Sequence, residues 1–415
     1  MRKILLAATA CAAPVAFAHP ALAAPPKAQW GDPMKVSDTL TIDPIVDGRL
    51  RYETVDQPLA DAEALTLRLR AGAEVRLGKL ALLAEGEGTA ALSTGYNAFP
   101  FSLADRQRRP QHSVIPDPMN VELNRLQLQY KGKAATFTLG RQRINIDDQR
   151  WVGAVGWRQN EQTFDAVRGD GKIGPVSLDG VYAIGQRSIF GVDAGPRQSY
   201  KGDFFMAGAA VKLGPVGAKA FAYVLDYDEA FFLANSSQTY GARVTTALPL
   251  GGKAKLALAA SYARQSDHGR NPFDYSADYI AAEAGLALGG LGVTAGYELL
   301  GSDSGRAVQT PMATLHKFNG WADLFLTTPN GGLEDIYGGI AYKFDGVKAL
   351  PGLNAAVTYH RFSSDAGSVR FGDEWDASLG FKLGRVGLLA KYADYSAKGF
   401  GVDTRKLWLQ AEFAF

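Results

Sequence analysis

The residues with the clearest chemical character are arginines that alternate with apolar residues in the first third of the chain. Arg49, Arg68, Arg70 and Arg125 share one side of predicted strands with acids such as Glu85 and Glu87. Guanidinium groups fixed along a water-filled passage would favour anions over cations. Alternatively, the same arginines pair with carboxylates on neighbouring strands and stiffen a wall. The residues alone leave both interpretations open.

A second unusual segment is 142–162, which combines basic, acidic and aromatic residues within a predicted loop. A loop that meets only water rarely contains two tryptophans together with several arginines. We therefore expect this loop to fold into a lumen or over its mouth, with Arg–Asp pairs fixing it. The predicted constriction residues are Arg143, Asp147, Asp148, Arg150, Trp151, Trp157 and Arg158.

Other kinds of chemistry find little support. His112, His268 and His316 are scattered, and His360 reads as a wall residue of a strand, so no metal-ligand spacing is present. The only cysteine, Cys11, falls in the N-terminal leader. No nucleophile-elbow motif occurs. We therefore assign no catalytic residue, no metal and no cofactor, and leave calcium binding by an acidic loop open.

The elements that must position these residues are strands joined by alternating short and long connections. Turns such as Leu77-Gly78-Lys79 and Leu383-Gly384-Arg385 separate segments in which polar and apolar residues alternate. Longer polar stretches alternate with these turns along the chain, so the short and long connections fall at opposite ends of the strands. This asymmetry is typical of outer-membrane barrels. The predicted strands, about 18 in number, are 44–55, 62–76, 79–91, 121–131, 134–142, 163–172, 176–187, 202–213, 216–226, 238–248, 253–265, 278–288, 291–301, 334–344, 353–363, 373–383, 386–396 and 404–415.

The fold class is thus all-β, a single transmembrane antiparallel barrel with short periplasmic turns and long extracellular loops. A soluble secreted β protein is the alternative. It would account for one apolar parity in a single strand, but not for the same pattern in every strand without a second domain. Because barrels have no free edge, we expect the last strand to pair with the strand around Arg49.

The ends of the chain carry further signals. Residues 1–23 read as a signal peptide, 24–43 as a short periplasmic lead-in and 44–415 as the barrel. The final strand, with its terminal Phe415, resembles the assembly signal read by the barrel-assembly machinery. Expected surroundings are outer-membrane lipid and lipopolysaccharide. The formal charge is +2, which becomes 0 without Arg2 and Lys3 (+2 − 2), so nothing calls for nucleic acid.

The segment around the predicted constriction also carries a family resemblance. Gly140-Arg141-Gln142, Asp147-Asp148-Gln149-Arg150 and Thr163-Phe164-Asp165 resemble motifs of the alginate export family of outer-membrane barrels. The resemblance implies an 18-strand barrel with an electropositive constriction for anionic polysaccharide. It also implies that Arg141 and Arg168 join the positive zone, although their simple parity is ambiguous and would need a bulge. The neutral net charge and the interspersed glutamates depart from a strongly cationic lumen.

The sequence therefore predicts a channel for passive passage of anionic polysaccharide or oligosaccharide, without catalysis. One alternative is a general or sugar-uptake porin for small solutes. An alternative of another class is a barrel enzyme that acts on lipid, which would need a coupled Ser–His or acid pair at the lipid rim.

Overall fold

The computed structural model describes residues 31–414, and it is an 18-strand closed antiparallel barrel. The barrel strands are β2 (Leu40–Asp56), β3 (Ala62–Leu77), β4 (Leu80–Ala91), β5 (Asn120–Lys131), β6 (Ala135–Gln142), β7 (Thr163–Ile173), β8 (Val176–Arg187), β9 (Ser199–Leu213), β10 (Val216–Tyr227), β11 (Ser237–Gly251), β12 (Ala254–Asp267), β13 (Ser276–Leu288), β14 (Leu291–Leu300), β17 (Leu333–Lys343), β18 (Asn354–Ser363), β19 (Arg370–Leu383), β20 (Val386–Ala397) and β21 (Thr404–Ala414). The predicted fold class is confirmed.

Short strands and helical turns accompany the barrel strands. β1 (Met34–Lys35) adds to the start of β2, and β15 (Ser302–Asp303) pairs with β16 (Arg306–Ala307). The helical turns are η1 (Val192–Arg197), η2 (Leu233–Asn235), η3 (Leu315–Lys317) and η4 (Ala366–Ser368). Across residues 31–414, no helix combines the length and apolarity that a membrane crossing requires. The predicted signal peptide lies outside the described residues.

Each predicted strand corresponds to one observed strand, with shifts at the ends. The largest early shift is at β2, which begins at Leu40 because β3 continues to pair with it as far as Leu77. Register irregularities occur where β4 meets β5, at Glu85/Gly86, and where β7 meets β8, at Asp165/Ala166. The unpaired residue at such a bulge changes the direction in which neighbouring side chains of the strand point.

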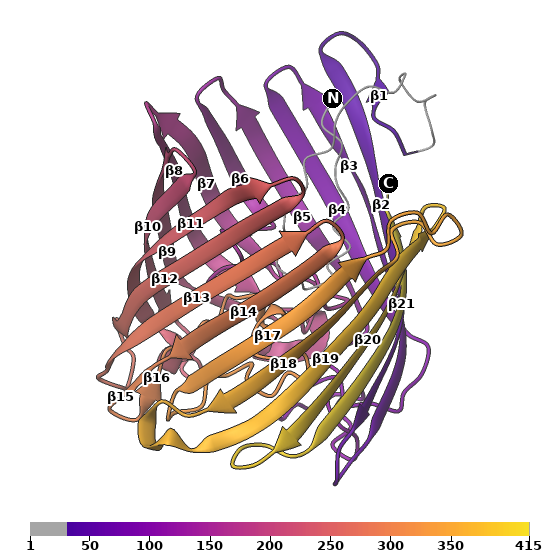
Figure 1. Ribbon diagram of the computed structural model, residues 1–415. Coiled ribbons are helices and arrows are strands. Elements are labelled where there is room, and N and C mark those ends of the chain that lie inside the picture. Colours follow the sequence, from indigo (N-terminus) through magenta and orange to yellow (C-terminus); the bar gives the residue numbers. More distant parts are fainter. Residues whose placement is uncertain (1–30, 415) are drawn as a thin grey trace.

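Short and long connections gather at opposite ends of the barrel. Figure 1 shows tight turns at one end, whereas long segments at the other end run back inside the ring of strands. Gly78, Gly174, Gly214 and Gly384 occupy the left-handed region in the tight turns, with nothing within 4 Å of an added Cβ. Glycine is therefore needed there for backbone conformation rather than for space.

The two faces of each strand differ as a membrane barrel requires. On β3, the side chains of Leu67 and Leu69 are 44% and 49% exposed, whereas Arg68 and Arg70 between them are buried. The exposed leucines face outward, where lipid would cover them, and the arginines face the lumen. The strand parity predicted for Arg49, Arg68 and Arg70 is thus the inward one.

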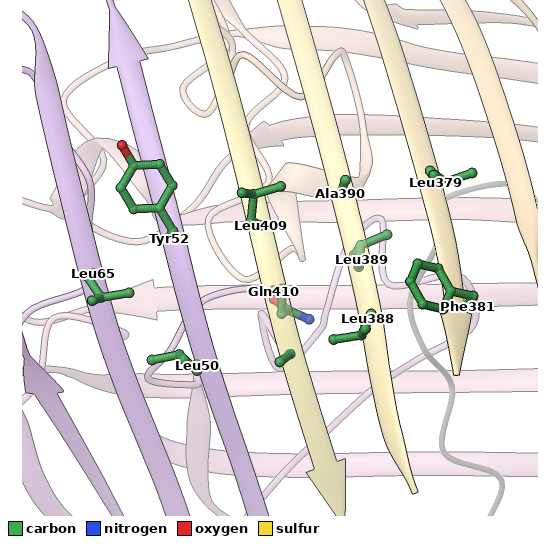
Figure 2. A pocket seen from close by; sticks show the side chains of 11 residues that line it. Leu50, Tyr52, Leu65, Leu379, Phe381, Leu388, Leu389, Ala390, Leu409 and Gln410 are labelled. Atoms are coloured by element: carbon green, nitrogen blue, oxygen red, sulfur yellow. The ribbon is translucent and has the colours of Figure 1, made fainter. Parts of the chain in front are cut away.

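The barrel closes where β21 pairs with β2, as predicted. Arg49 lies opposite Glu412, Leu50 opposite Ala411 and Glu53 opposite Trp408. Figure 2 shows the outward face of this seam, where Leu50 and Leu409 line a shallow apolar groove of about 370 Å³ together with side chains of β19 and β20. Phe415, the residue of the expected assembly signal, lies outside the described residues.

Candidate functional site: the lumen and its inner loops

Three long connections fold into the lumen, and we call them the inner loops: residues 92–119, 143–162 and 301–332. Each carries apolar side chains that are fully buried, among them Phe99, Ile144 and Met312. Such side chains cannot face water in an extracellular loop, so the chain buries them against inward-facing wall residues. Loops 143–162 and 301–332 also bind each other, because Gly153 N–H donates to the Met312 carbonyl at 2.8 Å.

Loop 143–162 makes a tight turn at Asp147 and Asp148. Asp147 and Gln149 adopt positive φ, which brings the two carboxylates to the opposite wall. Asp147 pairs with Lys219 of β10 at 3.1 Å, and Asp148 pairs with Arg243 of β11 at 2.7 Å. The predicted pairing of loop acids with basic side chains is present, but the partners belong to the wall.

Arg150 and Trp151 fix the next part of the loop. The Arg150 guanidinium donates to Glu298 of β14 at 2.6 Å and to Thr310 at 3.0 Å. The Trp151 ring packs edge-on against Tyr279 of β13, with 5.0 Å between centroids. The loop therefore crosses the lumen from β6 to the wall formed by β10 to β14.

Arg158 joins all three inner loops to the barrel. Its guanidinium lies 3.2 Å from Glu53 of β2, 2.6 Å from Asp323 in loop 301–332 and 3.8 Å from Asp117 in loop 92–119. All four side chains are almost completely buried. Three buried carboxylates around one guanidinium form a fixed junction, because opening it removes a counter-ion from each of them.

Trp157 lies at the seam of the barrel. Its ring stacks on His316 with 4.5 Å between centroids and an interplanar angle of 4°. The Arg51 guanidinium lies 4.1 Å from the same ring, and the Lys391 ammonium lies 4.0 Å from it. Trp408 of β21 meets it edge-on at 5.8 Å. One loop tryptophan thus contacts β2, β20 and β21.

The protonation state of His316 follows from its two neighbours. The Lys391 ammonium can only donate, so His316 Nε2 accepts from it at 2.7 Å and Nδ1 donates to Asp323 at 2.8 Å. Burial lowers the pKa of His316 well below 6.5 and keeps the ring neutral. Burial acts against ionisation of Asp323, but His316, Lys406 and Arg158 together hold its pKa well below the ordinary value.

The predicted wall arginines lie in a row on β2 to β5, and most of them are paired. Arg49 pairs with Glu412 at 3.1 Å, Arg70 pairs with Glu87, and Arg125 pairs with Glu85 at 2.6 Å. Among residues 31–414, Arg68 has an ion pair with Asp47 only, and its Nε and Nη1 atoms are buried without a hydrogen-bond partner there. The row therefore contains the ion pairs between neighbouring strands that the second interpretation of these arginines predicts.

In two ion pairs of the lumen, the basic side chain is more exposed than its acidic partner. The Arg125 side chain is 15% exposed and its partner Glu85 is 1% exposed. Arg143 of the loop is 33% exposed and its partner Glu161 is 1% exposed. In both pairs the carboxylate lies behind the guanidinium, so the lumen water meets the cationic partner.

The two arginines implied by the family resemblance face opposite sides of the wall, Arg141 outward and Arg168 into the lumen as expected. Arg141 is opposite Leu126, an outward and exposed residue of β5, and it pairs with Asp165 at 2.8 Å. The bulge that would turn it inward is not at this strand pair, so we place Arg141 on the outer face. Arg168 is opposite Thr138, a buried inward residue, and pairs with Asp170 at 2.7 Å.

Several important residues were missed by the sequence analysis. Asp117 follows no strand pattern, Glu161 lies in segment 142–162 but was given no role, and His316 was considered only as a metal ligand. His360 was assigned to the wall, and it lies there with Nδ1 3.0 Å from Asp335. Within residues 31–414, no group of three or more His, Asp or Glu side chains is arranged to hold a metal.

Comparison with known proteins finds a family model that resembles part of the chain. Residues 60–185 match the alginate export family. The match covers β3 to most of β8, including Arg68, Arg70, Arg125 and loop 143–162, and it confirms the resemblance seen in the motifs. None of the curated proteins matches the chain.

Solved structures show the same fold at low identity. OpdK of Pseudomonas aeruginosa, solved with vanillate, has a TM-score of 0.71 and 17% identity, covering 91% of this chain and 98% of its own. OccAB4 of Acinetobacter baumannii has a TM-score of 0.72 and 12% identity, covering 90% and 98%. With the alginate export match and the outward apolar face, this identifies an outer-membrane β-barrel channel.

Proposed function

We propose that the barrel is a passive channel for anionic solutes up to the size of an oligosaccharide. The observation that carries the proposal is the exposure of Arg125 and Arg143 in front of buried Glu85 and Glu161. A lumen that presents guanidinium groups to water lowers the electrostatic barrier for anions, even when the paired charges sum to zero. Catalysis has no part in this proposal.

The inner loops favour small solutes over a long polymer. Loops 143–162 and 301–332 cross the lumen, bind each other and are anchored by buried ion pairs. A polymer would need these contacts to open, whereas a small anion can pass beside fixed loops. OpdK, which shares the fold, was solved with vanillate, a small carboxylate, and this supports the same size class.

Export of a full anionic polysaccharide is the second candidate. It is favoured by the alginate export match over residues 60–185, which includes loop 143–162. A general porin without charge preference is the third, and the numerous wall pairs favour it.

Reversal potential in a KCl gradient tests the charge preference. The wild type should prefer chloride, and Arg125→Gln with Arg143→Gln should shift the reversal potential toward potassium, most strongly at low salt, where screening is weak. Arg264→Gln is the matched control, because Arg264 pairs with Asp278 on the outer wall. A wild type without ion preference would reject the anion channel in favour of the general porin, and a wild type that prefers potassium would reject the anion channel as well.

Liposome uptake separates the two size classes. Vesicles that contain the protein should admit mono- and disaccharide uronates faster than neutral sugars of equal size. Polymeric alginate should neither pass nor block until loop 143–162 is removed. Passage of the polymer through the intact protein would instead establish the polysaccharide exporter.

A further inference from the structure

A polar cavity lies on the outside of the barrel, away from the lumen. It occupies about 250 Å³ at the loop end of β17, β18 and β19. Two arginines, three serines and two acids line it: Arg361, Arg370, Ser363, Ser364, Ser368, Glu334 and Asp365. None of these residues takes part in the lumen contacts described above.

The cavity lies at the depth of lipid headgroups. Arg361 is opposite Ile336, which is outward and exposed, so Arg361 also faces outward. Two residues earlier on the same face, Tyr359 packs against Trp375, with 4.9 Å between ring centroids and Trp375 well exposed. Outward Tyr and Trp mark the border between hydrocarbon and headgroups in membrane barrels. The arginines thus begin where the hydrocarbon ends, on the extracellular side.

The cationic groups of the cavity are incompletely paired. Within residues 31–414, no hydrogen bond or ion pair holds the Arg361 guanidinium. Arg370 donates from Nη2 to Asp373, but its Nε is buried and has no acceptor in the described part of the chain. A buried donor without an acceptor costs free energy that a bound acceptor recovers.

The acids of the cavity already have donors. Glu334 accepts the hydroxyl hydrogens of Tyr297 at 3.1 Å and Ser363 at 3.1 Å. Asp365 accepts the Ser302 N–H at 2.8 Å. The donors left available in the cavity are the exposed guanidinium of Arg361 and the buried Nε of Arg370.

We propose that this cavity binds a phosphate group of a phosphorylated glycolipid in the outer leaflet. Guanidinium groups match phosphate oxygens in a planar, bidentate arrangement. With the phosphate on Arg361 and Arg370, the acyl chains of the same lipid extend along the outward apolar face past Trp375 and Ile336. The site is separate from the proposed transport path, and it stands or fails independently of solute selectivity.

Native mass spectrometry of the purified full-length barrel tests the site, with bisphosphorylated lipid A as the probe. The wild type should retain one lipid A, and Arg361→Gln with Arg370→Gln should weaken binding by about tenfold or more. Lipid A without phosphates should bind the wild type as weakly as lipid A binds the double variant. Arg405→Gln is the matched control, because Arg405 is an exposed arginine on β21, away from the cavity.

Unboiled gel mobility verifies that each variant is folded. If the double variant does not fold, Arg361→Gln alone gives the readout, since Arg361 holds no other described residue. Equal retention by the wild type and the folded variant, or equal loss in Arg405→Gln, would overturn the site. Inorganic phosphate that displaces lipid A at equal concentration would overturn the lipid as its occupant.

Discussion

Arg158 gives the sharpest test of how the inner loops are held. Its guanidinium neutralises Glu53, Asp323 and Asp117, and all of these side chains are almost fully buried. Replacing it with glutamine leaves buried carboxylates with fewer counter-ions, while Arg51 still contacts Asp117 and Lys406 still contacts Asp323. Glu53 is the acid with no second ion pair among the described residues.

The magnitude follows from the burial. Removing one partner of a buried ion pair costs about 3–5 kcal/mol. Because the contacts of Arg51 and Lys406 persist, we take about 3 kcal/mol for the docking of loop 143–162. At about 1.4 kcal/mol per factor of ten, the undocked fraction of the loop should rise about a hundredfold.

Cysteine labelling measures this fraction. Ala154 is 2% exposed in loop 143–162, so a cysteine there reacts with a soluble maleimide only while the loop is undocked. Ala154→Cys should react about a hundredfold faster in the Arg158→Gln background than in the parent. The Arg264→Gln background is the control and should leave the rate unchanged.

A coupled variant distinguishes the ion pair from general damage. Glu53→Gln with Arg158→Gln removes both charges, so it should recover part of the lost docking. An increase below about threefold in Arg158→Gln would refute the reasoning. Additive effects of the two substitutions would refute it as well.

Four other outcomes follow from the same contacts. Deleting 146–158 should raise single-channel conductance, because this segment crosses the lumen; unchanged conductance would place it outside the ion path. Trp157→Cys should label slowly with a large external maleimide, and labelling as fast as an exposed loop cysteine would contradict its burial. Leu50→Cys with Ala411→Cys should form a disulfide across the seam, whereas Leu50→Cys with Ala390→Cys should not. The contribution of His316 to the free energy of unfolding should fall as pH drops from about 7 to 5, because unfolded chains protonate His316 near 6.5 while the native ring stays neutral. This contribution is at most about 1.4 kcal/mol per pH unit, the value for one proton. His316→Asn should remove it from the slope of the wild type, and an unchanged slope would contradict the neutral ring.

The strands could be predicted from the sequence because their evidence is local. Alternation such as Leu67, Arg68, Leu69 and Arg70 specifies a strand and assigns its two faces at once. The start of β2 was placed too late, at 44 rather than Leu40, since pairing with β3 rather than alternation decides that end.

The lumen contacts were largely beyond prediction because they are not local. The density of Trp and Arg in 142–162 indicated an inward loop, but nothing near Trp157 in the sequence points to His316 or Lys391. The family resemblance gave a wrong orientation at one strand end, where parity was ambiguous. Arg141 was included through the family motif, and the register with Leu126 turns it outward.

The position of Trp157 has a consequence for how the barrel assembles. The two strands of the seam are the most distant in the chain, so bringing them together carries the greatest loop-closure entropy and is slow. Trp157 touches side chains from β2, β20 and β21, and Arg49 donates to the carbonyl groups of Gly156 and Trp157. Loop 143–162, which is adjacent in sequence to neither seam strand, therefore holds the two strands together from the lumen side. Docking of loop 143–162 and pairing of β2 with β21 are linked equilibria, so a substitution that weakens one also weakens the other.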